Sequence, residues 1–258
     1  MVLPYQQLFS VIKDKNNFLV LTNLEKPGDL LKISEETEID RVKTRNSIKS
    51  LEKFSLVEKK SEVYFLTEIG AQIVKKTKGI SFLSSNSSYF LGHKFEEIPT
   101  SLLQRIEEFS NCKIINSIWP VSTRLVEMVK NTSEFVNCIF SEPPFLLAEP
   151  LYEKIHSGIK FKILFGQNSK LNDCNDLIEK MELNKPKQNQ LFEKRICEQV
   201  ITNVVVTDKE ACLMLGYKNN LADMTNAISS EDVNFIQWCN DFFDFKWNHG
   251  EPFARLRV

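Results

Sequence analysis

Basic side chains recur along residues 41–53 at the spacing of an α-helix. At about 100° per residue, small and apolar side chains fall on one side of this helix and basic side chains on another. The side expected to be buried carries Thr44, Ile48, Leu51 and Ser55. The candidate DNA-contact residues on the helix are Arg41, Lys43, Arg45, Asn46, Lys49 and Lys53. Arg, Lys and Asn contact phosphates and read base edges in the major groove, so the pattern predicts a DNA-binding helix. The alternative is an ordinary solvated helix face.

Two short strand patterns follow the basic helix, at residues 56–59 and 63–66. We expect them to pair as a hairpin that stands behind the helix as a wing. Lys59 and Lys60 lie near its turn, where we expect them to contact the DNA backbone or minor groove. The alternative for both is an ordinary surface lysine.

The segments around this helix have the order of a winged helix-turn-helix. Apolar residues at helical spacing predict helices over residues 5–14, 15–24 and 29–35. Thr67 is a good N-cap for a helix over residues 68–78, which we expect to end at Gly79. Residues 1–80 therefore form the predicted DNA-binding domain.

Charge is distributed unevenly along the 258 residues. Residues 1–80 hold 14 Lys and Arg against 11 Asp and Glu, a net charge of +3, whereas residues 81–258 hold 19 against 23, a net of −4. The overall content of 42% hydrophobic and 26% charged residues is typical of globular domains. No apolar run approaches the roughly 20 residues of a membrane span, and no signal peptide is recognisable, so we expect a cytoplasmic protein without a membrane partner.

The second part of the chain predicts a mixed sheet flanked by helices. Residues 81–88, with FLSSNSS at their core, are small and polar enough for a linker or a loop, so we expect a linker or junction over residues 81–98. Helix and strand patterns alternate from Pro99 onward. Helices are expected at residues 99–109, 143–156 and 173–181, closely spaced strands at 194–217, and a final helix at 230–247. We therefore predict an α+β fold with two domains, residues 1–80 and 99–258.

No motif in the sequence predicts a metal site, a cofactor or a catalytic residue. The six cysteines lack C-x-x-C spacing and the three histidines lie far apart, so the cysteines are expected to be reduced structural thiols rather than redox sensors. No nucleophile and base are recognisable together. Several aromatic residues either line a ligand pocket or, more commonly, form core: Trp119, Tyr152, Phe161, Phe165, Tyr217, Trp238 and Phe242.

Several phrases in order along the chain resemble a known family. They are SIKSLEKFSLVEKKSEVYFLTEIGAQIV, IPTSLLQRIEEFSNCKII, LYEKIHSGIKFKILF, ITNVVVTDKEACLMLGYKNN and ISSEDVNFIQWCNDFFDFKW. The chain resembles the archaeal winged-helix regulators that carry a methanogenesis-regulatory-protein middle domain. The resemblance implies a transcription regulator with an N-terminal DNA-binding domain and a C-terminal sensor or dimerisation domain.

A second resemblance concerns residues 201–208, which look like the phospholipase-D-type strand with its pattern His-x-Lys-x4-Asp. Ile201 stands at the histidine position, Asn203 at the lysine position, and only Asp208 matches. Ile lacks a nucleophilic atom and Asn lacks the positive charge, so phosphodiesterase chemistry through this motif is not supported. We interpret Asp208 as a residue of a hairpin turn.

These observations predict a DNA-binding transcription regulator that is not an enzyme and has no cofactor. The expected partners are double-stranded DNA, a second copy of the chain in a homodimer, and an unidentified small-molecule effector. Two alternatives are a phospholipase-D-like phosphodiesterase or nuclease targeted by a winged helix, and a protein-interaction adaptor.

Overall fold

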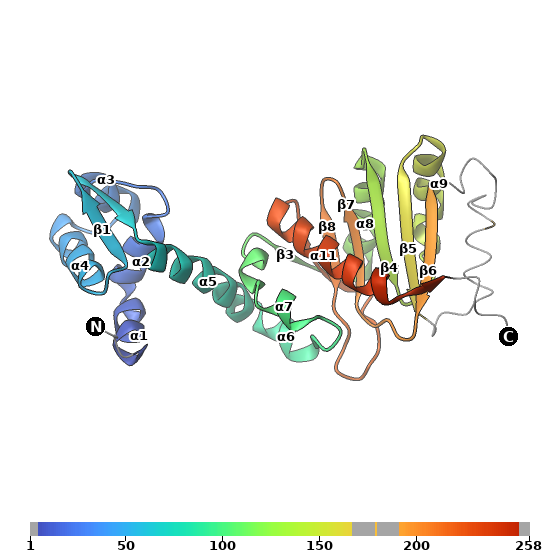
Figure 1. Ribbon diagram of the computed structural model, residues 1–258, viewed down its shortest axis with the longest axis horizontal. Coiled ribbons are helices and arrows are strands. Elements are labelled where there is room, and N and C mark those ends of the chain that lie inside the picture. Colours follow the sequence, from blue (N-terminus) through green and yellow to red (C-terminus); the bar gives the residue numbers. More distant parts are fainter. Residues whose placement is uncertain (1–4, 167–178, 180–190, 253–258) are drawn as a thin grey trace. The chain divides into compact units, whose positions relative to one another are not determined.

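The computed structural model describes residues 5–166, 179 and 191–252 and divides into two compact units, residues 1–80 and 81–258 (Figure 1). Each unit mixes helices and strands, and the second contains a large mixed sheet, so the α+β prediction is confirmed. The helix predicted at residues 173–181 lies outside the described residues.

The first unit places four helices before a two-stranded hairpin. These elements are α1 (Tyr5–Lys13), α2 (Lys15–Asn23), α3 (Leu30–Thr37), α4 (Arg41–Lys53), β1 (Val57–Lys60) and β2 (Val63–Leu66). Helix α5 (Glu68–Ser85) follows the hairpin. The side chains of Asp14, Asp29 and Asp40 accept hydrogen bonds from the first turns of α2, α3 and α4, so each helix begins at an aspartate N-cap.

The apolar side of α4 lies in the core of this unit. Ile48 and Leu51 are buried with Leu21 of α2 and Ile33 of α3. Thr44 is also buried, and its hydroxyl donates to the carbonyls of Ile39 and of the N-cap Asp40, so its polar atom is satisfied. The predicted burial of Thr44, Ile48 and Leu51 is confirmed, and the opposite side of the helix faces solvent.

The prediction that Ser55 lies on the buried side of α4 is wrong. The helix ends at Lys53, and Ser55 takes a left-handed backbone conformation with φ of 56°. The Ser55 and Leu56 amides donate back to Glu52 and Leu51, which closes the helix terminus and leaves the Ser55 side chain exposed.

Gly70 allows α5 to pack directly on the backbone that leads into the hairpin. The Thr67 amide donates to the Leu56 carbonyl, and a Cβ at Gly70 would lie 2.0 Å from that same carbonyl oxygen. We expect Gly70→Ala to lower the free energy of unfolding of this unit by about 3 kcal/mol, because the clash is with backbone. Urea unfolding followed by circular dichroism measures the loss. Gly92→Ala is the control, since a Cβ there meets nothing within 4 Å; equal midpoints for the two variants would contradict the packing argument.

Helix α5 does not end at Gly79 as predicted, and the predicted linker or junction, residues 81–98, contains helical segments. The helix continues to Ser85, and α6 (Ser87–Gly92) follows it. One glycine costs a helix only about 1 kcal/mol. Phe82 beyond it is buried against the rings of Phe90 and Phe109, and this packing holds the last turn of α5.

The second unit is built on a sheet that has eight strands within the described residues, in the order β10-β6-β5-β4-β7-β8-β9-β3. Strands β4, β5 and β6 are parallel, and the other neighbouring pairs are antiparallel. The strands are β3 (Lys113–Asn116), β4 (Phe135–Phe140), β5 (Lys160–Gly166), β6 (Phe192–Cys197), β7 (Asn203–Thr207), β8 (Ala211–Met214), β9 (Asn226–Ser230) and β10 (Glu251–Pro252).

Helices cover both faces of this sheet (Figure 1). Helices α8 (Ile118–Asn131) and α9 (Ala148–His156) pack on one face, and α7 (Thr100–Leu103) and α11 (Val233–His249) pack on the other. Alternate residues of β4 point to the two faces, with Cys138 in one core and Ile139 in the other. The predicted mixed sheet flanked by helices is confirmed.

Some elements of this unit differ from the prediction. The helix expected over residues 99–109 is broken into α7 and the 3-10 turn η1 (Ile106–Phe109). The indole N–H of Trp238 donates to the Leu102 carbonyl at 2.9 Å, at the point where α7 ends. The helix expected to begin at Pro143 begins at Ala148, after the 3-10 turn η2 (Phe145–Leu147).

The cysteines of the described residues are free thiols, and Cys138, Cys212 and Cys239 are buried. Burial raises the pKa of the Cys138 thiol and raises that of Cys212 to about 12. A thiol with a raised pKa carries little thiolate at neutral pH, so these side chains pack as small apolar groups.

Candidate nucleic-acid interface

The exposed face of α4 brings together the six candidate residues that the sequence placed on this helix. All six have exposed side chains: Arg41, Lys43, Arg45, Asn46, Lys49 and Lys53. Asp40 caps the helix, and the backbone amide of Lys43, the first of several contributions, holds the pKa of Asp40 below its ordinary value. The Lys43 ammonium lies 3.1 Å from the same carboxylate, so Lys43 is the one cation of this face that has an acidic partner among the described residues.

Four of the cations on α4 have no side-chain partner within the described part of the chain: Arg41, Arg45, Lys49 and Lys53. The Asn46 side chain is likewise without a hydrogen bond to these residues. Asn46, Arg45 and Lys49 fall within roughly 100° of one another around the helix. The structure therefore gathers unneutralised positive charge and an amide on one accessible face, which is the chemistry that phosphates and base edges require.

Lys59 and Lys60 lie at the end of β1, next to the hairpin turn. Both are engaged with acidic neighbours, because the Lys59 ammonium lies 3.0 Å from Glu62 and that of Lys60 lies 2.6 Å from Glu58. The hydrogen bond to Glu62 raises the pKa of Lys59. These two lysines consequently add less net positive charge to the surface than those of α4.

Val42 belongs to the same helix face and was missed in the sequence. Its side chain is 68% exposed and lies one turn before Arg45 and Asn46. An apolar side chain among basic residues can contact the methyl group of thymine, which only the major groove presents. The signal in the sequence was a single valine on a polar helix face, and such valines are common on surfaces.

The phospholipase-D-like positions do not form an open site. Ile201 and Asn203 are buried, and the Asn203 side-chain oxygen accepts from the Ser141 amide at 2.7 Å. Asp208 accepts hydrogen bonds from the Thr132 hydroxyl and from the Ser133 amide. Burial raises the pKa of Asp208, but these hydrogen bonds outweigh burial and leave the pKa below its ordinary value. Asp208 thus ties its turn to the end of α8.

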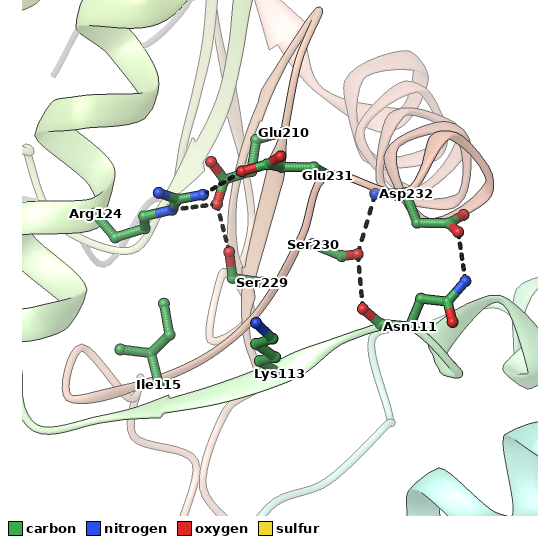
Figure 2. A pocket seen from close by; sticks show the side chains of 9 residues that line it. All are labelled: Asn111, Lys113, Ile115, Arg124, Glu210, Ser229, Ser230, Glu231 and Asp232. Atoms are coloured by element: carbon green, nitrogen blue, oxygen red, sulfur yellow. Dashed lines mark hydrogen bonds and ion pairs between the residues drawn. The ribbon is translucent and has the colours of Figure 1, made fainter.

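A polar cavity of about 640 Å³ opens at one end of the sheet in the second unit (Figure 2). Its lining residues come from the segment before β3, from β3 and α8, from the β7–β8 turn, and from β9 and the residues before α11. They are Asn111, Lys113, Ile115, Arg124, Glu210, Ser229, Ser230, Glu231 and Asp232. No local pattern in the sequence predicts this cavity, because its lining residues are spread over 122 positions.

A buried contact between a histidine and an aspartate lies elsewhere in the second unit. The His93 Nε2 atom lies 2.8 Å from the Asp223 carboxylate, and Nδ1 lies 2.6 Å from the Tyr89 carbonyl. Both partners are hydrogen-bond acceptors that face the ring nitrogens. The ring is stacked between those of Tyr89 and Tyr217, with centroids 4.0 Å and 4.7 Å away. This cluster joins α6 to the segment before β9.

The aromatic residues considered for a ligand pocket are mostly core. Phe161, Phe165, Trp238 and Phe242 are buried in the two cores of the sheet, whereas Trp119 is 79% exposed at the start of α8. Among the described residues, no group of three or more His, Cys, Asp or Glu side chains could hold a metal ion. A search of the same residues found no helix long and apolar enough to cross a membrane.

Comparisons with known proteins give similarity in structure only. No protein-family model matches the chain, and no match was found among curated proteins. One similar solved structure is TrmBL2, an archaeal chromatin protein described as showing a novel mode of DNA binding. It is 13% identical, with 96% of this chain and 100% of that chain covered and a TM-score of 0.43.

Methyltransferases are also among the similar structures. An O-methyltransferase family protein from Burkholderia thailandensis is 9% identical, with 78% of this chain and 66% of that chain covered and a TM-score of 0.24. CalO1, a methyltransferase in calicheamicin biosynthesis, is 13% identical, with 76% of this chain and 63% of that chain covered and a TM-score of 0.25. These matches contradict the expectation that the chain is not an enzyme, and we withdraw it. At these TM-scores they assign no reaction to the chain.

Proposed function

We propose that the chain is a transcription regulator that binds operator DNA through a winged helix in its first unit. In this proposal α4 enters the major groove, and the β1–β2 hairpin lies beside it as the wing. The DNA-contact residues are Arg41, Lys43, Arg45, Asn46, Lys49 and Lys53 on the helix, with Lys59 and Lys60 on the wing. The observation that supports it is the set of four cations on the exposed face of α4 that have no acidic partner among the residues the structure describes.

The charge pattern favours the helix over the wing as the principal contact. Helix α4 presents four cations without acidic partners among the described residues, whereas Lys59 and Lys60 are each paired with a glutamate. An unpaired lysine or arginine can bind a phosphate without first breaking an ion pair. Its contribution to DNA affinity is therefore larger than that of a lysine already paired with a glutamate.

Footprinting on the DNA upstream of the protein's own coding sequence tests the proposal. We expect protection of a discrete site that survives excess random-sequence DNA, because base-edge contacts add to the phosphate contacts. Protection without any preference for sequence would contradict a regulator that recognises an operator. An absence of DNA binding at low salt would favour the alternative of a protein-interaction adaptor.

Val42 gives this proposal a residue-level test. We expect Val42→Ala to lower the affinity for the protected site by about fivefold, on the order of 1 kcal/mol, and to leave the affinity for random DNA unchanged. Fluorescence anisotropy with both DNAs measures the ratio. Val233→Ala is the matched control, because Val233 is 74% exposed on α11 in the other unit. Equal losses on both DNAs would exclude a base contact by Val42.

Dimerisation and effector binding complete the proposal. One winged helix reads few base pairs, and two copies on a two-fold operator would supply the missing specificity. Helix α1 offers an apolar surface for such a contact, since Phe9 is 64% exposed beside a groove that Ile69 and Ile73 of α5 also line. The second unit would act as the sensor or dimerisation domain that modulates DNA binding.

A further inference from the structure

Hydrogen bonds hold the carboxylates on the acidic side of the second unit's cavity in place, but they do not use every carboxylate oxygen (Figure 2). One oxygen of the buried Glu210 carboxylate accepts from the Arg124 Nε atom and from the Ser229 hydroxyl, both at 2.6 Å. One oxygen of Glu231 accepts from another Arg124 nitrogen at 2.8 Å. The second oxygen of each carboxylate has no hydrogen bond from any residue that the structure describes.

Asp232 adds a third negative charge to the lining. Its carboxylate accepts from the Asn111 side chain at 2.7 Å and from the Asn234 amide at 2.8 Å. Burial raises the pKa of Asp232, but these hydrogen bonds outweigh it and leave the pKa below its ordinary value, so the group is ionised at neutral pH.

The basic side of the cavity is Lys113 on β3. Arg124 is committed to Glu210 and Glu231, whereas Lys113 makes no hydrogen bond or ion pair with the described residues. Figure 2 shows its ammonium group extending toward the space beside Ser229. The cavity therefore presents an unpaired cation on one strand and carboxylate oxygens without partners on the segments opposite.

A ligand that carries charge of only one sign leaves either Lys113 or the carboxylates of the cavity without a partner. An anion alone would pair with Lys113 but would meet three carboxylates, and a cation alone would leave Lys113 without a partner. A metal ion lacks a suitable group of ligands among the described residues. A molecule with both an ammonium and a carboxylate group satisfies the two sides together.

We propose that this cavity binds a zwitterionic molecule of amino-acid or dipeptide size, with its carboxylate on Lys113 and its ammonium on Glu210 and Glu231. The volume of about 640 Å³ lies within the usual range for small-molecule sites. The site consists of residues of the second unit alone, so the proposal does not depend on DNA binding by α4.

Thermal unfolding of the full chain with three matched sets of probes tests the charge requirement. The first set is the common amino acids with simple dipeptides, the second their N-acetyl derivatives, and the third their methyl esters. At a ligand concentration about 100 times Kd, we expect at least one zwitterion to raise Tm by roughly 5 °C or more. The derivatives of that molecule lack the cation or the anion, and we expect neither to raise Tm.

Two variants locate the binding. We expect Lys113→Ala to weaken the affinity for the stabilising zwitterion by about tenfold or more, because a charge-assisted hydrogen bond is lost. Glu231→Gln should also weaken the affinity for the zwitterion. The Glu231 side chain is 73% exposed, so we expect this variant to fold. Lys160→Ala is the control, because Lys160 is an exposed lysine on another strand of the same sheet.

Every other outcome overturns the proposal. Stabilisation by the methyl esters alone identifies a cation site, and stabilisation by the N-acetyl derivatives alone identifies an anion site. No shift with any zwitterion at 10 mM, or equal affinities for Lys113→Ala and Lys160→Ala, likewise excludes the site. DNA binding is tested separately by footprinting, so a negative result for the cavity does not contradict the DNA-binding proposal.

Discussion

Replacing Arg45 and Lys49 together with alanine is expected to lower DNA affinity about 100-fold at low salt. Both side chains are exposed on the same face of α4 and lack acidic partners among the described residues. Each charge-assisted contact to a phosphate or base contributes about 1.5 kcal/mol or more, and two such losses give this factor. Because each phosphate contact releases a counterion, the slope of log affinity against log salt should fall by about 2.

The control for this experiment removes the same charge elsewhere in the first unit. Lys13 and Lys15 are exposed at the junction of α1 and α2. Their double alanine variant should keep nearly the full affinity, since only long-range attraction is reduced. Anisotropy titrations at several salt concentrations measure both variants. Similar losses in the two would mean that net charge, and not the α4 face, determines binding.

Replacing Asp223 with alanine is expected to destabilise the second unit by about 4 kcal/mol. Asp223 is fully buried and accepts hydrogen bonds from His93, Thr225 and Asn226. Its removal leaves the polar groups of His93, Thr225 and Asn226 without their acceptor, and each buried donor left unsatisfied costs about 1–3 kcal/mol. Thermal unfolding should show a Tm lowered by roughly 10 °C.

Two comparisons separate the loss of the Asp223–His93 contact from a general loss of packing. Asp244→Asn is the control, because Asp244 is exposed on α11, and it should change stability by less than about 0.5 kcal/mol. In a double-mutant cycle, Asp223→Ala and His93→Ala together should cost at least 1 kcal/mol less than the sum of the single costs. Additive costs would show that the two side chains are not coupled.

The pH dependence of stability follows from the direction of the Asp223 shift. Burial raises the pKa of Asp223, but the hydrogen bonds from Thr225, Asn226 and His93 outweigh it, so the folded-state pKa lies below its unfolded value of about 3.9. Protons therefore bind more tightly to the unfolded chain. The contribution of Asp223 to the free energy of unfolding is complete above about pH 4 and is lost as the pH falls through the folded-state pKa. The Asp223→Ala variant should not show this loss.

Local periodicity was enough to predict α4 and its two faces. The 3.6-residue repeat separates Ile48 and Leu51 from Arg45 and Lys49, and the structure buries the first pair and exposes the second. The end of the helix was harder to predict, because the left-handed conformation of Ser55 depends on hydrogen bonds that only the closed turn makes. The DNA contacts themselves remain a proposal.

Non-local pairing explains what the sequence pattern missed in the second unit. Strand β9 is short and partly polar, and its partner β3 lies more than 100 residues earlier in the chain. Two ordinary surface-type residues, Arg124 and Glu210, form an ion pair 86 positions apart. Neither pairing leaves a local periodic signal, since contact between distant segments is decided by the topology of the sheet.

The sequence by itself determined the α+β class, the basic face of α4 and the helices that flank a mixed sheet, because each is encoded in spacing along a short stretch. Only the tertiary structure decided which charges are neutralised. It paired Lys59 and Lys60 with glutamates, left Arg45 and Lys49 of α4 without acidic partners among the described residues, and buried Asp223 against His93. Charge pairing depends on distances of a few ångströms between side chains, and these distances exist only after the chain has folded.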